Sequence, residues 1–345
     1  MNDRQKTWLA FFKEKKSASR LEIERFAADA VPTVSRATLL RDLASLAADG
    51  KISKTGTGRA VRYVYSVSPI LETFDMDRYF AHDPDERELV SESFNFDIWE
   101  HLKNLLTARE KPQLAALNQA YRERIATLSP ALLKKEFERI TIELSWKSSK
   151  IEGNTYTLLD TEMLIKENIE ASGKTKDEAR MVLNHKRAMD YIFSEPGYFK
   201  KVSVRKLEDL HRLLVEGLGV AHGIRGRRVG ITSTRYRPLD NPHQIREALE
   251  RLCAVLNAAA EPLEKAMVAV LMISYLQPFE DGNKRAARIL GNALLLAHGW
   301  CPLSYRSVDE LAYKKAVLLF YERNSAHAFK KLFLEQFTYA VENYF

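Results

Sequence analysis

The chain has 345 residues, 46% of them hydrophobic and 29% charged, which is ordinary for a soluble globular protein and excludes disordered, collagen-like and fibrous classes. Its length predicts about two domains. Cys253 and Cys301 are not part of a CxxC pattern or a Cys/His cluster, so we expect neither a disulfide framework nor structural zinc. No targeting segment is visible, and the apolar run 267–276 is shorter than the ~20 residues a bilayer requires. We therefore expect a cytoplasmic protein with no membrane association.

The formal net charge of +7 is unevenly distributed. Residues 1–66 carry +6, residues 67–100 carry −8, and the remaining residues carry +9. Pro69 and Pro84 interrupt the acidic stretch, which favours a connector that is partly helical at most, with an acidic surface helix as the alternative. These balances predict a basic domain at 1–66, an acidic linker at 67–100 and a larger domain at 101–345.

Residues 1–66 predict three helices followed by a hairpin. Apolar positions at 8–12 and 21–26 indicate two amphipathic helices. Ser35 can cap a third helix, whose leucines at 39, 40, 43 and 46 form one face and which ends at Gly50. Ile52 enters a strand, residues 55–58 form a glycine-rich turn, and alternation from Val61 to Tyr65 marks the returning strand. This order resembles a winged helix-turn-helix domain.

Such a domain offers the first side chains of its third helix to DNA bases and phosphates, and the cations of its wing to the backbone. The candidate DNA contacts are Ser35, Arg36, Thr38, Arg41, Lys54, Arg59 and Arg62. DNA is therefore the expected partner, and a protein-contact module with a solvated positive face is the alternative. A two-fold symmetric operator would be bound by a homodimer.

The densest group of chemical residues lies between two apolar helices, in LMISYLQPFEDGNKRAARILGNALLLAHG at 271–299. Gly282 allows close backbone approach, and the helix that follows presents partial positive charge at its N-terminus. Lys284, Arg285 and Arg288 add full charges, while Asp281 supplies the hard oxygen that Mg²⁺ prefers when it is shared with phosphates. The residues alone leave phosphate binding and a plain surface connection both open.

Here the sequence resembles the Fic (Fido) family, whose signature is HxFx(D/E)GN(G/K)R followed by xxR. The matching residues are Phe279, Asp281, Gly282, Asn283, Lys284, Arg285 and Arg288. SSKIEGN is similar to the family's inhibitory pattern (S/T)xxxE(G/N) at Ser148, Glu152 and Gly153. GIRGRRVGITSTRYRPL stands where the family has a flap that holds a target segment, with Val229 and Ile231 alternating before Thr232 and Ser233 as in a short hairpin that accepts an added strand.

The resemblance covers about residues 100–345 and implies a mainly α fold, a Fic-type helical bundle with one β-hairpin flap. The usual activity of the family is transfer of AMP from ATP, with Mg²⁺, to a protein hydroxyl. By resemblance Asp281 would hold the metal, Gly282 and Asn283 would form the anion turn, and Lys284 and Arg285 would hold phosphates. Arg288 would bind the terminal phosphate or pair with the inhibitory Glu152, since a carboxylate in the guanidinium fork blocks a productive grip on ATP.

One residue departs from the signature at the position that carries the chemistry. The family's histidine, which removes the proton from the attacking hydroxyl, is Gln277 here, and an amide cannot accept a proton. Among candidate substitutes, His211 is expected to be a packed or capping residue, and His222 and His243 fall in predicted loops without a visible partner. Lys284 replaces the more frequent glycine, as in the Doc branch, which resembles a kinase.

Two functions remain open from the sequence. A DNA-binding regulator with a nucleotide-binding Fic domain of weak or absent AMP transfer accounts for Gln277 and the basic first 66 residues. An active adenylyltransferase restrained by Glu152 accounts for the retained arginines. A purely structural interaction module accounts for neither set.

Overall fold

A computed structural model describes residues 1–345, apart from the side chain of Arg59. The chain divides into two compact units, one of residues 1–72 with 104–116 and one of residues 73–103 with 117–345. This division differs from the expected one, because residues 73–100 of the expected acidic linker belong to the larger unit and residues 104–116 belong to the smaller one. Among the described residues, no helix has both the length and the hydropathy needed to cross a bilayer.

The smaller unit combines three helices with a three-stranded antiparallel sheet. Its elements are α1 (Asp3–Lys15), β1 (Ser17–Ser19), α2 (Arg20–Ala30), α3 (Arg36–Ala48), β2 (Ile52–Thr55) and β3 (Arg62–Tyr65), with the strand order β1-β3-β2. Ser35 caps α3 by accepting a hydrogen bond from the backbone N–H of Thr38, and Gly50 takes a φ of 66° after the helix end. The three helices and the hairpin predicted here are confirmed, whereas β1 was not predicted.

A single apolar core holds these elements together. Trp8 and Phe12 of α1 pack with leucines 39, 43 and 46 of α3 and with Tyr63 of β3, and all of them are buried. The Trp8 indole donates to the carboxylate of Asp42 at 3.2 Å, so the one polar atom of that ring is satisfied inside the core. The period of the apolar residues therefore sets both the helices and the face that each of them buries.

The larger unit is helical. Its elements are α4 (Met76–Phe80), α5 (Glu110–Thr127, which begins in the smaller unit), α6 (Pro130–Ile151), α7 (Leu158–Glu167), α8 (Lys176–Ser194), α9 (Val204–Val215), α10 (Pro242–Ala258), α11 (Pro262–Leu276), α12 (Asn283–Ala297), α13 (Glu310–Arg323) and α14 (His327–Asn343). Short 3-10 helices lie at Phe96–Glu100 and Pro196–Lys200. The mainly α prediction is confirmed.

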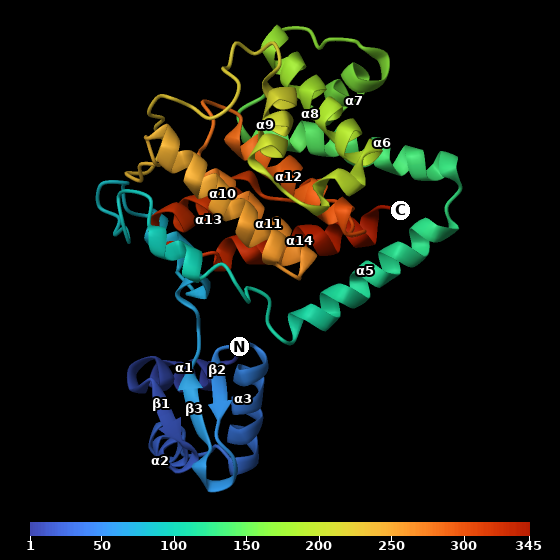
Figure 1. Cartoon of the computed structure of the whole chain (residues 1–345). Helices are drawn as coiled ribbons and strands as arrows, with labels where there is room; N and C mark the ends of the chain where they lie inside the picture. The colour runs from blue at the N-terminus through green and yellow to red at the C-terminus, as the bar shows by residue number, and fades with distance from the viewer. The chain divides into compact units, whose positions relative to one another are not determined.

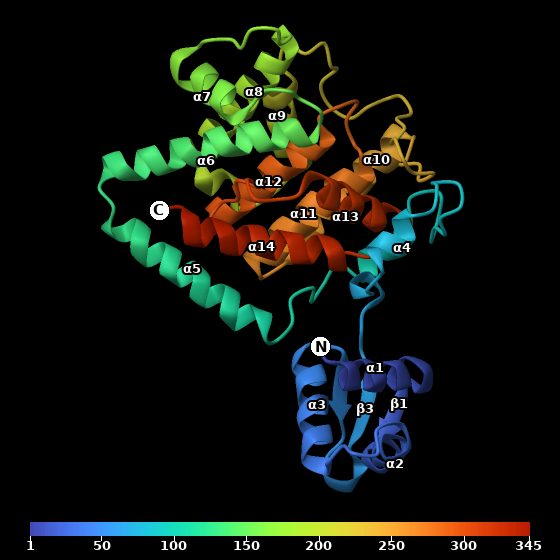
Figure 2. The ribbon, with the colours of Figure 1, turned by 180° about the vertical axis from the view of Figure 1, so that it is seen from behind.

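Two buried helices, α11 and α12, lie side by side at the centre of this unit (Figure 1). Gly291 of α12 permits the close approach, because a Cβ at that position would lie 2.9 Å from the Val270 side chain. Helices α6, α8 and α9 pack on α12, and α10 and α13 pack on α11; α6 and α14 lie on opposite sides of the central pair (Figure 2). Neighbouring helices thus pack on both of the helices that flank the turn at residues 277–282.

Candidate functional site

The turn between α11 and α12 is fixed by two backbone conformations and one side chain. Gln277 ends α11 in the left-handed region (φ 47°, ψ 58°), and Gly282 precedes α12 with a φ of 78°. The Asn283 amide accepts from the N–H of Phe279 and donates to its carbonyl, both at 2.8 Å. The Asn283 amide therefore closes the turn with a pair of hydrogen bonds to the backbone. The first N–H groups of α12 have no partner within the helix and remain available to a ligand.

A cavity of about 470 Å³ opens on this turn. Its lining comes from the turn, from the end of α6, from the flap segment and from α13: Ile151, Glu152, Gly153, Val229, Gly230, Ile231, Thr232, Ser233, Gln277, Glu280, Asp281, Gly282, Asn283, Lys284, Arg285, Tyr313, Lys314, Val317, Leu318 and Tyr321. The structure thus brings the signature turn, part of the inhibitory motif and the flap residues together at one hollow.

Arg285 lies under the turn and is held by a carboxylate within it. Its Nη2 donates to Asp281 Oδ2 at 2.8 Å, and only 2% of the Arg285 side chain is exposed, against 66% for Asp281. Burial lowers the pKa of the Arg285 guanidinium, and the Asp281 charge opposes that shift. The exposed carboxylate leaves lone pairs toward the cavity, so this pair can offer a cation and a hard oxygen to one polyphosphate.

Glu152, at the C-terminal end of α6, lies between two cations. Arg288 Nη2 donates to its Oε1 at 2.8 Å, and Lys284 Nζ lies 3.5 Å from its Oε2. Burial favours the neutral carboxyl, but the charges of Arg288 and Lys284 outweigh it and hold the pKa of Glu152 below its ordinary value. The Glu152 carboxylate therefore binds the Arg288 guanidinium that a phosphate would need. Lys284 is a second partner of Glu152, which the resemblance did not indicate.

Ser148 extends this contact into the core. Arg288 Nε donates to Ser148 Oγ at 2.8 Å and Arg288 Nη2 donates to the Ser148 carbonyl at 2.9 Å. Ser148 Oγ lies 2.8 Å from Nε2 of His185, whose Nδ1 donates to the Met181 carbonyl. Burial lowers the pKa of His185 to about 3, so the ring is neutral and accepts the hydroxyl proton. Sequence reasoning missed His185, although it stands in the buried stripe of α8 between Val182 and Met189.

Gln277 is buried at 8% exposure and its amide is already engaged. The side-chain Nε2 donates to the Ser274 carbonyl at 2.6 Å, and the backbone carbonyl of Gln277 accepts from Arg225 Nε at 2.7 Å. No histidine is among the described residues that line the cavity. The family's histidine position, where a proton acceptor is needed, thus holds the Gln277 amide, which is hydrogen-bonded to the last turn of α11.

His211, the first candidate substitute, is a packed residue. It stacks on Phe279 with ring centroids 3.9 Å apart, and its Nε2 donates to the Asp281 carbonyl at 2.8 Å. Burial lowers its pKa to about 4, against the opposite effect of that hydrogen bond. His211 therefore stabilises the turn by packing on Phe279 and bonding to Asp281. His243 lies in the first turn of α10, where a loop was predicted.

The predicted β-hairpin flap is wrong. Across residues 222–240 the structure forms an irregular segment whose only bridge pairs Arg237 with Ser93 of the connector. Val229 and Ile231 are half-buried, while Thr232 and Ser233 are exposed in a turn where Ser233 has a φ of 69°. Arginine side chains, in place of a strand ladder, hold the two arms together.

Arg225 makes most of those bonds, and sequence reasoning missed it. It is 4% exposed, and besides Gln277 its guanidinium donates to the carbonyls of Arg227 and Leu239. Its N–H also donates to the Pro278 carbonyl at 3.0 Å. One buried cation therefore ties both arms of the flap to the turn. No sequence pattern identifies it, because its partners are backbone carbonyls and the Gln277 carbonyl is 52 residues away.

The connector packs against the other arm of the flap. Arg235 donates to the carbonyls of Pro84 and Arg87 and pairs with Glu92 at 2.8 Å. Arg87 in turn donates to the Ser233 carbonyl and lies 3.2 Å from Glu322, both side chains being almost fully buried. Residues 84–93 of the acidic stretch are therefore joined to the flap by hydrogen bonds and an ion pair, and they help to fix its conformation.

The candidate DNA contacts lie in the smaller unit. Arg36, Arg41 and Lys54 are exposed, and Arg36 Nε pairs with Glu24 at 2.9 Å. Arg41 donates to the Thr38 hydroxyl, and Arg62 donates to Ser17. Ser35 is occupied as the cap of α3. The side chain of Arg59 falls outside the described residues.

The site residues fit a bound polyphosphate and an accompanying magnesium ion. Lys284, Arg285 and Asp281 line the cavity, so they offer two cations and one carboxylate to a ligand there. Gly282 has a φ of 78°, and a Cβ on it would lie 3.0 Å from the Val215 side chain, so any other residue at this position would strain the turn. Among the described residues no group of three or more acidic, His or Cys side chains gathers as a metal site. Asp281 alone matches the sparse protein ligation of Mg²⁺ bound with phosphates.

Comparison with known proteins agrees with this geometry. Residues 201–295 match the model of the Fic/DOC family. "Protein adenylyltransferase Fic" of Drosophila ananassae is 26% identical over 179 residues, covering 51% of this chain and 36% of that protein. The protein of the same name from Nematostella vectensis is 28% identical over 189 residues, covering 52% and 43%. The chain thus spans less than half the length of these relatives.

Solved structures share the fold. Fic-1 (residues 134–508) of C. elegans superposes with a TM-score of 0.56 at 19% identity, covering 68% of this chain and 71% of that one. A Fic domain containing signaling protein from Bacteroides thetaiotaomicron gives a TM-score of 0.56 at 20% identity, covering 67% and 93%. The helical unit therefore has the fold of these structures.

Proposed function

We propose that this chain, which carries a domain of the Fic/DOC family, is a DNA-binding regulator whose nucleotide pocket transfers AMP weakly or not at all. The observation that carries the proposal is Gln277. Its amide is bonded to the Ser274 carbonyl at the place where the family signature has a histidine, and no described histidine lines the cavity. The pocket is built to bind a nucleotide and lacks the group that would start the reaction.

The missing group decides the rate. In AMP transfer a hydroxyl oxygen bonds to the α-phosphorus, the bond from that phosphorus to the bridging oxygen breaks, and pyrophosphate leaves while a base takes the hydroxyl proton. An amide takes no proton, and losing a general base removes roughly 10²–10⁴ of rate. Binding is not affected by this loss, because the cations and the free N–H groups of α12 remain.

ATP with Mg²⁺ is the expected ligand of the pocket. Gly282 and Asn283 would form the anion turn, Lys284 and Arg285 would hold phosphates, and Asp281 would ligate the metal, which neutralises phosphate charge when bound. Release of Arg288 from Glu152 would add a further phosphate contact.

The DNA half of the proposal rests on the smaller unit. The order of its elements and its sheet order β1-β3-β2 support assignment as a winged helix-turn-helix domain, with α3 as the recognition helix and residues 52–65 as the wing. A homodimer acting in the cytoplasm on a two-fold operator is part of the same proposal. Its regulatory input would be the ligand of the larger unit.

Labelling with ATP tests the catalytic half. The purified chain and its Glu152→Gly variant are incubated with Mg²⁺ and ATP labelled at the α-phosphate, alone and with a lysate. We expect label in neither, and a gain of about 10²-fold or more when Gln277→His is added to Glu152→Gly. Robust labelling by the unmodified chain would overturn the regulator.

An electrophoretic mobility shift of a promoter fragment from the gene that encodes this chain tests the DNA-binding part of the proposal. Affinity must fall as salt rises, because each phosphate contact releases counterions, and Lys54→Ala should lower the slope of log affinity against log salt by about 1. Binding that is absent, or that is insensitive to salt, removes this half and leaves the catalytic half intact.

A second candidate is an adenylyltransferase restrained by Glu152. The 2.8 Å bond between Arg288 and Glu152 and the intact phosphate-binding residues favour it, and the relatives named above carry that activity in their names. In that case Glu152→Gly alone would release transfer to a protein hydroxyl.

A further inference from the structure

Glu24, in α2 of the smaller unit, binds two arginines through one carboxylate oxygen. Its Oε1 accepts from Arg20 Nε at 3.0 Å, one turn earlier in the same helix, and from Arg36 Nε at 2.9 Å. The hydrogen bond from Arg20 and the charge of Arg36 hold the pKa of Glu24 below its ordinary value, against the effect of burial. Because Arg36 is the first residue of α3, Glu24 links α2 to the start of the proposed recognition helix.

This link adds little to the stability of the smaller unit. The side chains of Arg20 and Arg36 are 42% and 67% exposed, against 28% for Glu24. Exposed ion pairs contribute little to folding, because water and salt screen them. The two helices are held by apolar residues instead, since Ile23 and Ala27 of α2 share one core with leucines of α3. The contact is better explained by its effect on the Arg36 side chain.

The bond to Glu24 leaves one edge of the Arg36 guanidinium free. Nε is engaged, whereas among the described residues no hydrogen bond involves Nη1 or Nη2. A guanidinium can place two N–H groups on O6 and N7 of a guanine. With Nε held by a carboxylate, Nη1 and Nη2 at the end of the side chain remain for that contact. The bond also fixes the direction of a flexible side chain before DNA arrives, which lowers the entropy cost of binding.

The exposed face of α3 offers few other groups that can hydrogen-bond to bases. Ala37, Arg41, Ala44 and Ala48 are exposed and recur at the spacing of one helix face. An alanine methyl contacts apolar groups such as the thymine methyl, and its small size lets the helix approach the floor of the major groove. The long cationic side chains exposed on α3 are thus limited to Arg36 and Arg41.

We propose that Glu24 is a positioning residue for DNA recognition, which holds the Arg36 guanidinium by Nε so that Nη1 and Nη2 contact one guanine in the major groove. The inference rests on the DNA-binding half of the proposed function and is independent of the nucleotide pocket. A carboxylate near DNA repels the phosphates of every sequence, so Glu24 favours the correct sequence at the expense of the others. Removal of Glu24 therefore has two opposite effects, a higher affinity for random DNA and a lower discrimination at one base pair.

Selection from a duplex library tests this role on the full chain. The chain and its variants are incubated with DNA duplexes that carry about 20 random base pairs, enough for two half-sites, and the bound duplexes are sequenced. We expect the parent to select a guanine at one position of each half-site, and Arg36→Ala to lose that preference about tenfold or more. Glu24→Ala should lose about fivefold at the same position and at no other, while its affinity for a scrambled duplex rises.

Two control variants separate position from charge. Asp29→Ala removes the same charge from an exposed residue of α2 that has no partner among the described residues, so it should leave the guanine preference unchanged. Glu24→Gln keeps an acceptor oxygen and should retain more of the preference than Glu24→Ala does. In the Arg36→Ala background, Glu24→Ala should have no further effect at that position, because the two residues act as one unit.

Failure of the positioning role differs from failure of DNA binding. A parent that binds no duplex, or selects no sequence, overturns the DNA-binding half and the role of Glu24 with it. A parent that selects a sequence, together with a Glu24→Ala variant that keeps the full guanine preference, overturns the positioning role alone. Equal losses in Glu24→Ala and Asp29→Ala assign the effect to charge, and a loss at every position with a lowered melting temperature assigns it to folding; each of these results also overturns the positioning role.

Discussion

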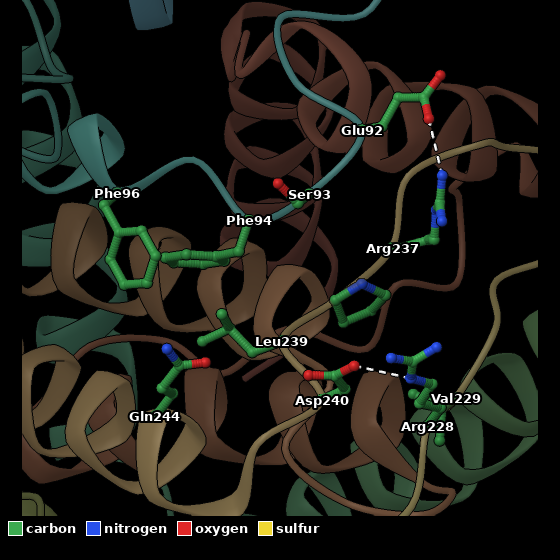
Figure 3. Close-up of a pocket in the computed structure, with 11 residues that line it drawn as sticks. Glu92, Ser93, Phe94, Phe96, Arg228, Val229, Arg237, Leu239, Asp240 and Gln244 are labelled. Carbon is green, nitrogen blue, oxygen red and sulfur yellow. Dashed lines mark hydrogen bonds and ion pairs between the residues drawn. The ribbon is translucent and has the colours of Figure 1, made fainter.

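The turn at residues 277–288 and the flap at residues 223–240 face the same cavity but are held in opposite ways. The turn lies between packed helices, and two of its cations are buried and paired, Arg285 with Asp281 and Arg288 with Glu152. The flap is irregular, and three of its five arginines are exposed, of which Arg228 and Arg237 pair with carboxylates at the surface, beside a cavity of about 540 Å³ (Figure 3). We therefore expect a substitution in the turn to lower the free energy of unfolding more than a substitution in the flap does.

The comparison also separates binding from reaction. Everything that can hold phosphate lies in the rigid turn, and the missing proton acceptor is in that same turn, at Gln277. The flap differs from the turn, because among the described residues no backbone hydrogen bond involves residues 229–231. Under the proposed function, the turn would bind a nucleotide while AMP transfer is slow or absent.

The largest expected effect is that of Arg288→Met. The substitution leaves Glu152 facing the core without its main cation, and removing one partner of a buried pair costs about 3 kcal/mol or more of unfolding free energy. Urea unfolding measures it. The double variant Arg288→Met with Glu152→Gln should recover most of the loss, because no uncompensated charge remains. A single variant as stable as the parent would show that this pair does not hold the turn.

A pH-dependent loss of stability should come next in size. The unfolded pKa of His211 is near 6.5 and its folded pKa is lowered to about 4, so the unfolded state binds a proton first as pH falls. Stability from this group is therefore present above about 6.5 and lost below it, by roughly 2 kcal/mol between pH 7 and pH 5. Urea unfolding at both pH values should show a smaller difference in His211→Gln. An identical difference in the variant would exclude this role.

Two glycines give a matched test of the contrast between turn and flap. Gly282→Ala forces a left-handed φ of 78° on alanine and places its Cβ 3.0 Å from Val215, which should cost about 1–2 kcal/mol and weaken ATP binding. Gly230→Ala meets no atom within 4 Å of its Cβ and carries no such φ, so its cost should be near zero. Thermal unfolding and calorimetric titration with ATP compare them. Equal costs would remove the distinction between a rigid turn and a permissive flap.

Local signals in the sequence explain what could be predicted. The cap at Ser35 and the turn glycine at Gly50 depend on neighbouring residues alone, so the helix between them could be predicted to within a residue. The pairing of Glu152 with Arg288 followed from a resemblance, because 136 residues separate them and no pattern joins them. In both cases the prediction rested on information already present in a short motif.

The flap could not be predicted because its conformation is decided by distant groups. Alternation at Val229 and Ile231 favours a strand, but Arg225 binds carbonyls of both arms and the connector supplies the partner of Arg237. These contacts reach across the chain and satisfy the backbone without a ladder, so the local β pattern does not decide the outcome. The acidic stretch at residues 67–100 was expected to be a connector that is partly helical at most, and its contacts with the flap could not be predicted for the same reason, because the partner residues lie elsewhere in the chain.

The smallest expected effect is that of Arg228→Ala on stability. Its pair with Asp240 is 2.7 Å long, but the two side chains are 87% and 46% exposed, and such pairs contribute about 0.5 kcal/mol or less and are screened by salt. Thermal unfolding at low and high salt should therefore barely separate the variant from the parent. A loss above about 1 kcal/mol would mean that the pair holds this arm of the flap in place.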